Sequence, residues 1–155
     1  MTSRANVQLK LDKITTLLAQ PSGFARLDPN QRKFLFAAVL AMIVPADGKV
    51  KDCERQKLQS LLQANQSSGY MLIDAMNLAE LPRDVEKCVD ALAKALGELL
   101  GAQDRSTLVR HLWELALSDD ELHDFEERLI YRIADASGVA RKNVAAELAK
   151  AAANH

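Results

Sequence analysis

The chain is poor in the residues that interrupt helices or crosslink small folds. Its 155 residues include 6 glycines, 4 prolines and 2 cysteines, and aromatic residues make up only 5%. This composition excludes the collagen-like, low-complexity and disulfide-stapled classes of protein. Cys53 and Cys88 lie in helical patterns without the CxxC or Cys/His spacing of metal sites, which indicates a reducing compartment.

The chain also lacks an excess of charge and a long apolar run. Its 20 Lys and Arg residues are balanced by 21 Asp and Glu residues, so no clustered basic field is expected to recruit nucleic acid. The longest uncharged stretch, Phe34–Ala46, is well short of the roughly 20 apolar residues that cross a membrane. The first residues have no apolar signal-peptide core. We therefore expect a cytoplasmic protein with no integral membrane segment and no nucleic acid partner.

What the chain does contain is helical periodicity along nearly its whole length. Hydrophobic residues make up 48% of it and recur at spacings of three and four. We predict an all-α protein, with residues 1–155 forming one domain, a compact bundle of seven or eight helices. The apolar positions that mark these helices include Ile14, Leu40, Leu61, Met76, Leu92, Leu112, Ile130 and Val144.

Local signals predict where some of these helices begin and end. Asp28, Pro29 and Gln31 form the pattern of a capping box, which predicts the start of a buried core helix over Gln31–Ala46. Gly138 is predicted to follow the end of a later helix as its left-handed C′ residue. The single tryptophan, Trp113, is predicted to pack in the core.

One segment of the chain occurs twice. Asp47–Glu54 matches Asp119–Glu126 at an offset of 72 residues, with three acids and the apolar fourth position in common. Each copy follows one apolar helix and precedes another. We therefore predict two helix–turn–helix units, about residues 31–65 and 104–138, which are related by pseudo-twofold symmetry.

The two copies, with the helices before them, resemble the tellurite-resistance protein B (TerB-like) family. The likeness rests on Ala41–Val50 and Trp113–Glu127, in which an apolar helix leads into Asp-Gly-x-apolar-x-x-x-Glu or a close variant, and it spans roughly Gln31–Gly138. The resemblance implies a helical bundle of the bacterial cytoplasm, in a family tied to stress and tellurite resistance. It also implies that acidic residues hold a divalent metal.

Transferred by position, the family's acids fall on four residues of this chain. They are Asp47 and Glu54 in the first copy, and Asp119 and Glu126 in the second. The second copy departs from the family pattern, because Asp120 stands where the turn glycine is expected. The second turn is therefore expected to differ in shape from the first.

The acids also have a purely structural explanation. Glu54 and Glu126 would occupy the third position of a helix, where a carboxylate offsets the helix dipole and can accept from a free N–H. Asp47 and Asp119 fit less well, because they would lie at a helix C-terminus, where the dipole disfavours negative charge by ~0.3–1 kcal/mol. A bound cation would offset the unfavourable negative charge of these two aspartates. An all-oxygen ligand set favours Ca²⁺ or Mg²⁺ over Zn²⁺. The further acids that crowd the two turns are Asp52, Asp120, Glu121, Asp124 and Glu127.

Three functions are compatible with these patterns. The first is a non-catalytic module that acts through protein partners and binds a metal ion. The second is a metal-dependent hydrolase that activates water at Asp119 and Glu126, or at the His123–Asp124 pair. The third is a structural or oligomerising bundle that holds no cofactor. We favour the first, since the family resemblance supports it and the chain has no GxSxG, P-loop or dinucleotide motif.

Overall fold

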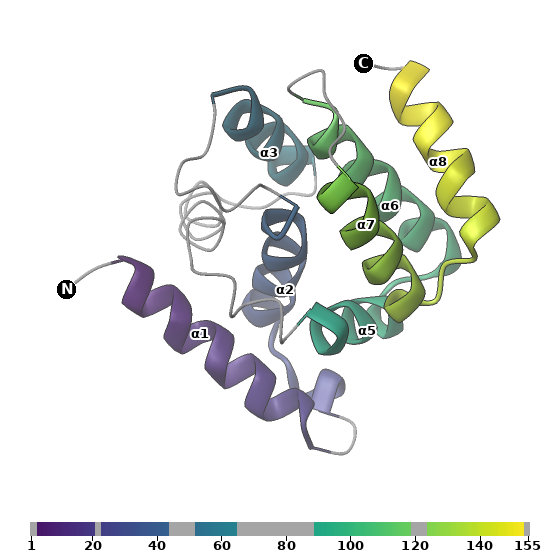
Figure 1. The fold of residues 1–155 in the computed structure, drawn as a ribbon. Coiled ribbons are helices and arrows are strands. Elements are labelled where there is room, and N and C mark those ends of the chain that lie inside the picture. The colour runs from purple at the N-terminus through teal and green to yellow at the C-terminus, as the bar shows by residue number, and fades with distance from the viewer. Residues whose placement is uncertain (1–2, 21–22, 44–51, 65–88, 119–123, 154–155) are drawn as a thin grey trace.

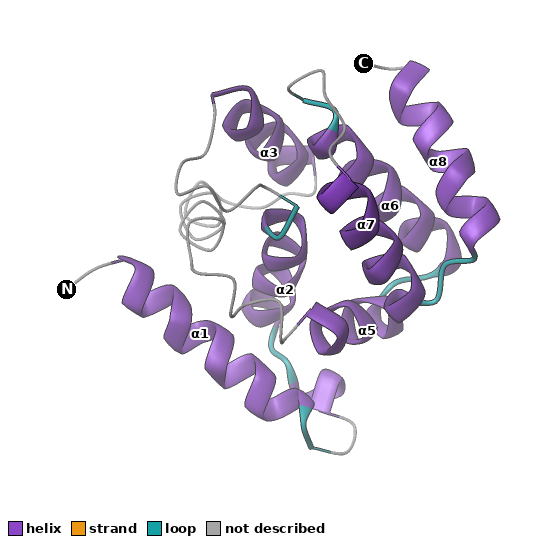
Figure 2. Ribbon diagram, in the orientation of Figure 1, coloured by secondary structure: helices purple, strands orange, loops and turns teal. Residues whose placement is uncertain are grey.

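The computed structural model describes residues 3–20, 23–43, 52–64, 89–118 and 124–153 (Figure 1). Within these ranges the chain forms seven α-helices, one short 3-10 helix and no strand (Figure 2), which confirms the all-α prediction. The elements are α1 (Ser3–Leu18), η1 (Gly23–Arg26), α2 (Pro29–Ala41), α3 (Asp52–Ala64), α5 (Val89–Leu99), α6 (Ala102–Ala116), α7 (Asp124–Ser137) and α8 (Arg141–Ala153). None of these helices is both long and apolar enough to span a membrane. The helix predicted around Met76 lies outside the described residues.

α2 lies in the middle of the bundle, between α1 on one side and α6 and α7 on the other (Figure 1). Its residues Phe34, Leu35 and Ala37–Ala41 are all buried. A helix that is apolar on nearly every side is stable only when other elements surround it. α3, α5 and α6 pack against α2, and the Lys10 ammonium of α1 stands 5.8 Å from the Phe34 ring centre. The prediction of a buried core helix is confirmed.

The start of α2 is a capping box, as the sequence predicts. The Gln31 backbone N–H donates to Asp28 Oδ1 (2.7 Å), and the Asp28 N–H donates to Gln31 Oε1 (2.9 Å). Pro29 occupies the first turn, where its missing N–H removes no helical hydrogen bond. Two free backbone groups are therefore satisfied at the point where the chain enters the core.

α2 ends at Ala41, earlier than the predicted end at Ala46. Hydrogen bonds with three-residue spacing appear at this end, including one from the Ile43 N–H to the Leu40 carbonyl (3.3 Å). Pro45 gives the physical reason. A proline has no N–H to donate, and it disfavours the helical conformation of the residue before it.

α5 and α7 cross at very short distance where Gly97 meets Ser137. A Cβ atom placed on Gly97 would lie 2.7 Å from the Ser137 Cα atom, and closer still to the Ser137 carbonyl oxygen. The atoms it would meet belong to the backbone, so they cannot rotate away. The Ser137 hydroxyl donates to the Ile133 carbonyl (2.8 Å), which turns that side chain back onto its own helix. Only glycine fits at this contact.

α7 ends in the left-handed turn that the sequence predicts. Gly138 has φ of +88°, a conformation that costs other residues energy. The Val139 N–H donates to the Ala134 carbonyl (2.9 Å), and the Gly138 N–H donates to the Asp135 carbonyl (3.3 Å). This pair of bonds is a Schellman motif, and it satisfies two carbonyls at the helix end.

Arg105 of α6 closes the junction between α5 and α6. Its Nε donates to the carbonyls of Gly97 (2.7 Å) and Leu100 (3.1 Å), at the negative end of the α5 dipole. A Cβ atom on Gly138 would lie 3.5 Å from Arg105 Nη1. The ends of α5 and α7 and the start of α6 therefore meet at one arginine side chain.

Trp113 ties α6 to α8. The side chain is fully buried, and its Nε1 donates to the Val144 carbonyl (3.0 Å). Its ring meets Tyr131 of α7 edge to face, with the ring centres 6.1 Å apart. The predicted core position of Trp113 is confirmed, and the hydrogen bond satisfies the one polar atom of the buried indole.

Gly97→Ala should lower the free energy of unfolding by about 1–3 kcal/mol, because the added methyl group meets fixed backbone. Gly101→Ser is the control. Gly101 is the N-cap of α6, nothing lies within 4 Å of a Cβ atom placed there, and serine is a preferred N-cap residue. Its stability should be unchanged or slightly higher. Urea unfolding of both variants measures the difference, and equal stabilities would contradict the close crossing.

Candidate functional site

The acids singled out in the sequence divide into two groups. Those of the turns, Asp47, Asp119, Asp120 and Glu121, lie outside the described residues. Those in the first turns of α3 and α7 are described: Asp52, Glu54, Asp124, Glu126 and Glu127. Within the described ranges, no three His, Cys, Asp or Glu side chains gather closely enough to hold a metal ion. A site built across both turns therefore stays a prediction.

Glu54 and Glu126 occupy the same place on their two helices. Each is the third residue of its helix, and the exposed fractions of the two residues are 4% and 2%. Leu58 and Ile130, one turn further along, are both fully buried. α3 and α7 thus bury corresponding positions at the offset of 72 residues that relates the two sequence copies. The pseudo-twofold relation of the complete units remains a prediction, because both turns lie outside the described residues.

Helix capping alone does not explain the burial of the two glutamates. Gln31 completes the capping box of α2 from the same third position and is only partly buried. Asp52 and Asp124 are exposed, although they lie at the same helix ends. Removing an ionised carboxylate from water costs several kcal/mol unless hydrogen bonds or an opposite charge replace the lost hydration. Both glutamates have interaction partners in the chain, so neither is a buried residue without a partner.

An ion pair that sequence reasoning missed joins α3 to α6. Lys57 Nζ lies 2.8 Å from Glu114 Oε2, and the Glu114 side chain is only 15% exposed. Arg110, one turn earlier on α6, stands 3.8 Å from the other Glu114 oxygen. Salt screens a partly buried pair less than an exposed one. The pair therefore helps to hold α3, which carries Glu54, against α6.

His111 lies on α6 one turn before Glu114. Burial lowers the pKa of its imidazole below the usual 6.5; Glu114 opposes this shift, and Arg110 and Lys57 add to it. The Nδ1 atom is buried and has no hydrogen-bond partner among the described residues. The imidazole is therefore uncharged at pH 7. The only signal in the sequence was its position within the apolar pattern of α6.

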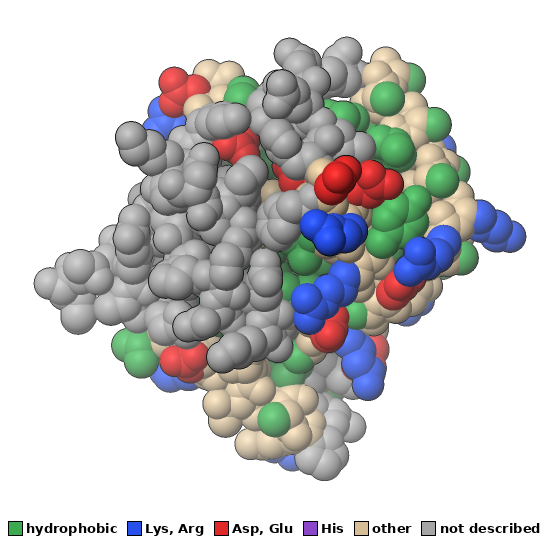
Figure 3. Space-filling model, viewed as in Figure 1, with side chains coloured by type: hydrophobic (Ala, Val, Ile, Leu, Met, Phe, Trp, Pro, Cys, Tyr) green, Lys and Arg blue, Asp and Glu red, His purple; other side chains and the backbone are tan. Residues whose placement is uncertain are grey.

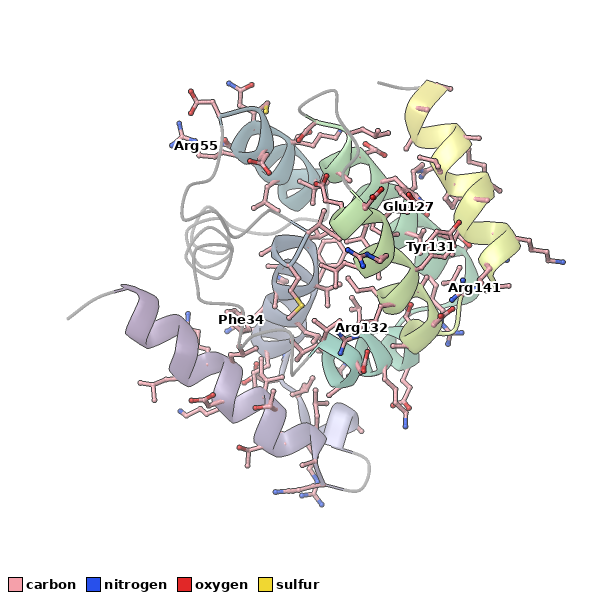
Figure 4. All side chains as sticks on the ribbon, viewed as in Figure 1. Phe34, Arg55, Glu127, Tyr131, Arg132 and Arg141 are labelled. Carbon is pink, nitrogen blue, oxygen red and sulfur yellow. The ribbon has the colours of Figure 1, made fainter. Side chains whose placement is uncertain are left out.

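A charged groove of about 890 Å³ runs along α7 (Figure 3). It contains two ion pairs: Arg132 Nε lies 2.9 Å from Asp90 Oδ1, and Arg141 Nη2 lies 3.1 Å from Asp135 Oδ2. Tyr131 also lines the groove, with the Arg141 guanidinium 5.3 Å from its ring centre (Figure 4). Four basic and three acidic side chains line the groove, so charges of both signs alternate along it and no extended field of one sign would attract a polyanion.

Comparison with known proteins identifies a family. The model of the family described as tellurite resistance protein TerB matches residues 33–149. The match runs from α2 into α8 and includes Glu54 and Glu126. No curated protein and no solved structure matches the chain.

Glu126→Ala should lower the free energy of unfolding by about 1–3 kcal/mol, because it removes a buried side chain together with the interactions that this side chain makes. Glu127→Ala is the matched control. It removes the same charge from the same helix end, but Glu127 is exposed, so the change should stay within about 0.5 kcal/mol. Chemical unfolding measures both variants. Equal losses would show that the helix dipole, and not burial, sets the role of Glu126.

The free energy of unfolding should decrease as the pH is lowered below about 6.5, and His111 should account for part of this decrease. The pKa of this imidazole is lower in the folded chain than in the unfolded chain, so the unfolded state takes up the proton first. This uptake favours the unfolded state. The resulting loss of stability is absent above pH 6.5 and grows as the pH falls toward the pKa of the folded state.

His111→Gln removes this penalty and leaves the titrating carboxylates in place. The difference in unfolding free energy between the wild type and His111→Gln, measured at about pH 7.5 and about pH 5.5, isolates the contribution of His111. The wild type should lose more stability than the variant at the lower pH. A difference that does not change with pH would refute the lowered pKa.

Proposed function

The chain belongs to the tellurite resistance protein TerB family, and we propose that it is a non-catalytic module that binds a divalent cation and acts through protein partners. One observation carries the proposal: Glu54 and Glu126 are buried at matching positions of α3 and α7. Together with Asp47 and Asp119 of the two turns, they would supply the oxygen ligands. The proposed link to stress or tellurite resistance, and the proposed cytoplasmic location, rest on the family and on the sequence.

The chemistry of the four acids favours a hard cation. They offer carboxylate oxygens and neither thiolate nor imidazole, which suits Ca²⁺ or Mg²⁺ better than Zn²⁺. Asp47–Glu54 is shorter than the 12-residue loop of an EF-hand, so a modest affinity is expected. Neighbouring carboxylates repel one another, and a cation between them replaces this repulsion with attraction. Binding would therefore stabilise the folded chain.

A cation bound at the first turns would act on a surface that partners can reach. Asp52, Asp124 and Glu127 are exposed on the same turns that bury Glu54 and Glu126. Neutralising the buried acids would change the potential over these exposed ones, and electrostatic complementarity governs how fast and how selectively proteins associate. We therefore propose the exposed acids as the surface through which the bound cation influences partner binding.

The alternative of a hydrolase has less support. It requires its acidic groups to converge on one water molecule. Asp124 and Glu126 are two residues apart on α7, and side chains at this spacing do not face each other. Accordingly, Asp124 is exposed and Glu126 is buried. The hydrolase that the sequence suggests uses either Asp119 with Glu126 or the His123–Asp124 pair, and Asp119 and His123 lie outside the described residues.

The cation proposal predicts a specific gain in thermal stability. Millimolar Ca²⁺ or Mg²⁺ at constant ionic strength should raise the melting temperature of the wild type, because a ligand that binds only the folded state stabilises it in proportion to RT ln(1 + [L]/Kd). The double variant Asp119→Asn, Glu126→Gln should lose that gain. Melting curves with and without each cation make the measurement.

The control for this experiment removes two exposed acids from the same helix. Asp124→Asn with Glu127→Gln makes the same change in net charge and should keep most of the increase. If both double variants respond like the wild type, the effect is ionic screening and the cation site is rejected. The proposal would then be left with an interaction module that binds no metal.

A further inference from the structure

α2, α5 and α6 enclose a second hollow, which none of the first-turn acids lines. Its volume is about 370 Å³, within the range of pockets for small molecules. Phe36 of α2, Leu99 of α5 and Leu108 of α6 form part of its apolar lining. Phe36 and Leu99 remain partly exposed although they pack against the core. The hollow is therefore an apolar cleft that a ligand can enter.

The same cleft carries one net positive charge. Arg32 and Lys33 of α2 stand against a single acid, Asp104 of α6. The Arg32 Nε donates to the Leu27 carbonyl (3.1 Å), which anchors the guanidinium. Lys33 is exposed and makes no ion pair with another described residue. This balance suits a ligand with one negative charge better than a phosphate ester, which carries nearly two at pH 7.

His111 adds an uncharged hydrogen-bonding group to the lining of the cleft. Its Nδ1 atom is buried without a partner, so Nε2 is the ring nitrogen left to meet a ligand. A buried N–H without an acceptor is rarer in proteins than a buried acceptor without a donor. This preference places the hydrogen on Nε2, where it can be donated to an anion.

We propose that this cleft binds a small amphipathic monocarboxylate. The hydrocarbon part of the ligand lies against Phe36, Leu99 and Leu108, and its carboxylate accepts hydrogen bonds from Lys33 and from His111 Nε2. Apolar walls alone would take any hydrocarbon, and a lysine alone would attract any anion. The two together select a ligand that has both parts. The cleft shares no ligand residue with the proposed cation site, so the two proposals stand or fall separately.

Octanoate is the probe for this site, and 1-octanol is the matched ligand without the charge. Each is titrated into the full chain while the backbone amide resonances are followed by NMR. Octanoate should shift amides of α2, α5 and α6 around the cleft, and it should bind about two- to fivefold more tightly than octanol, as expected for one ion pair at an accessible site.

Three variants test which parts of the cleft bind the ligand: two of them reverse a charge, and the third fills the cleft. Lys33→Glu should weaken octanoate at least about fivefold and leave octanol unchanged. Lys94→Glu makes the same charge change at an exposed position of α5 that does not line the cleft, and it should affect neither ligand. Thr107→Phe, from a partly exposed position in the lining, should fill the cleft and exclude both.

Several results would overturn the proposal. It is rejected if octanol binds as tightly as octanoate, or if Lys33→Glu and Lys94→Glu weaken octanoate equally. Shifts confined to residues outside the cleft, or no octanoate binding at millimolar concentration, would also reject it. The comparison of the two ligands and the positions of the shifts use the wild type alone, so they do not depend on whether any variant folds.

Discussion

The contact between Gly97 and Ser137 sets the geometry of the C-terminal half of the described fold. It lets the backbones of α5 and α7 approach more closely than any side chain would permit. Arg105 then joins the end of α5 to the start of α6, and Gly138 turns the chain from α7 toward α8. The position of α7 fixed in this way also fixes Glu126 at its other end. The candidate site therefore depends on a crossing that lies a whole helix away from it.

Sequence reasoning was most successful where a structural feature depends on neighbouring residues. The capping box at Asp28 and Gln31, the left-handed Gly138 and the buried periodicity of α2 are all local, and all were predicted from short patterns. The end of α2 was predicted too late, because the apolar run continues past Ala41, the last residue of the helix, which precedes Pro45 by four residues. The role of Gly97 was not visible, since its meaning comes from α7, which is far away in the sequence.

In the candidate site too, local features were predicted from the sequence, and features that depend on distant residues were not. The repeat at an offset of 72 residues drew attention to Glu54 and Glu126, and the third helical position of both was predicted correctly. Their burial was not, because the pattern of one helix does not show which neighbours cover its first turn. The Lys57–Glu114 pair and the cleft beside His111 arise from the packing of separate helices. The family match covers all of these residues, but it assigns no role to any of them.

The surroundings of Trp113 make its fluorescence an intrinsic probe of how the C-terminal helices pack. It is the single tryptophan of the chain, it is fully buried on α6, and its indole N–H bonds to the backbone of α8 while Tyr131 of α7 meets the ring edge. Indole fluorescence shifts to longer wavelength when the ring meets water. Its emission therefore follows the docking of α8 and α7 onto α6 without an attached dye. Local opening of α1, which α2 separates from α6 in Figure 1, would leave the signal unchanged.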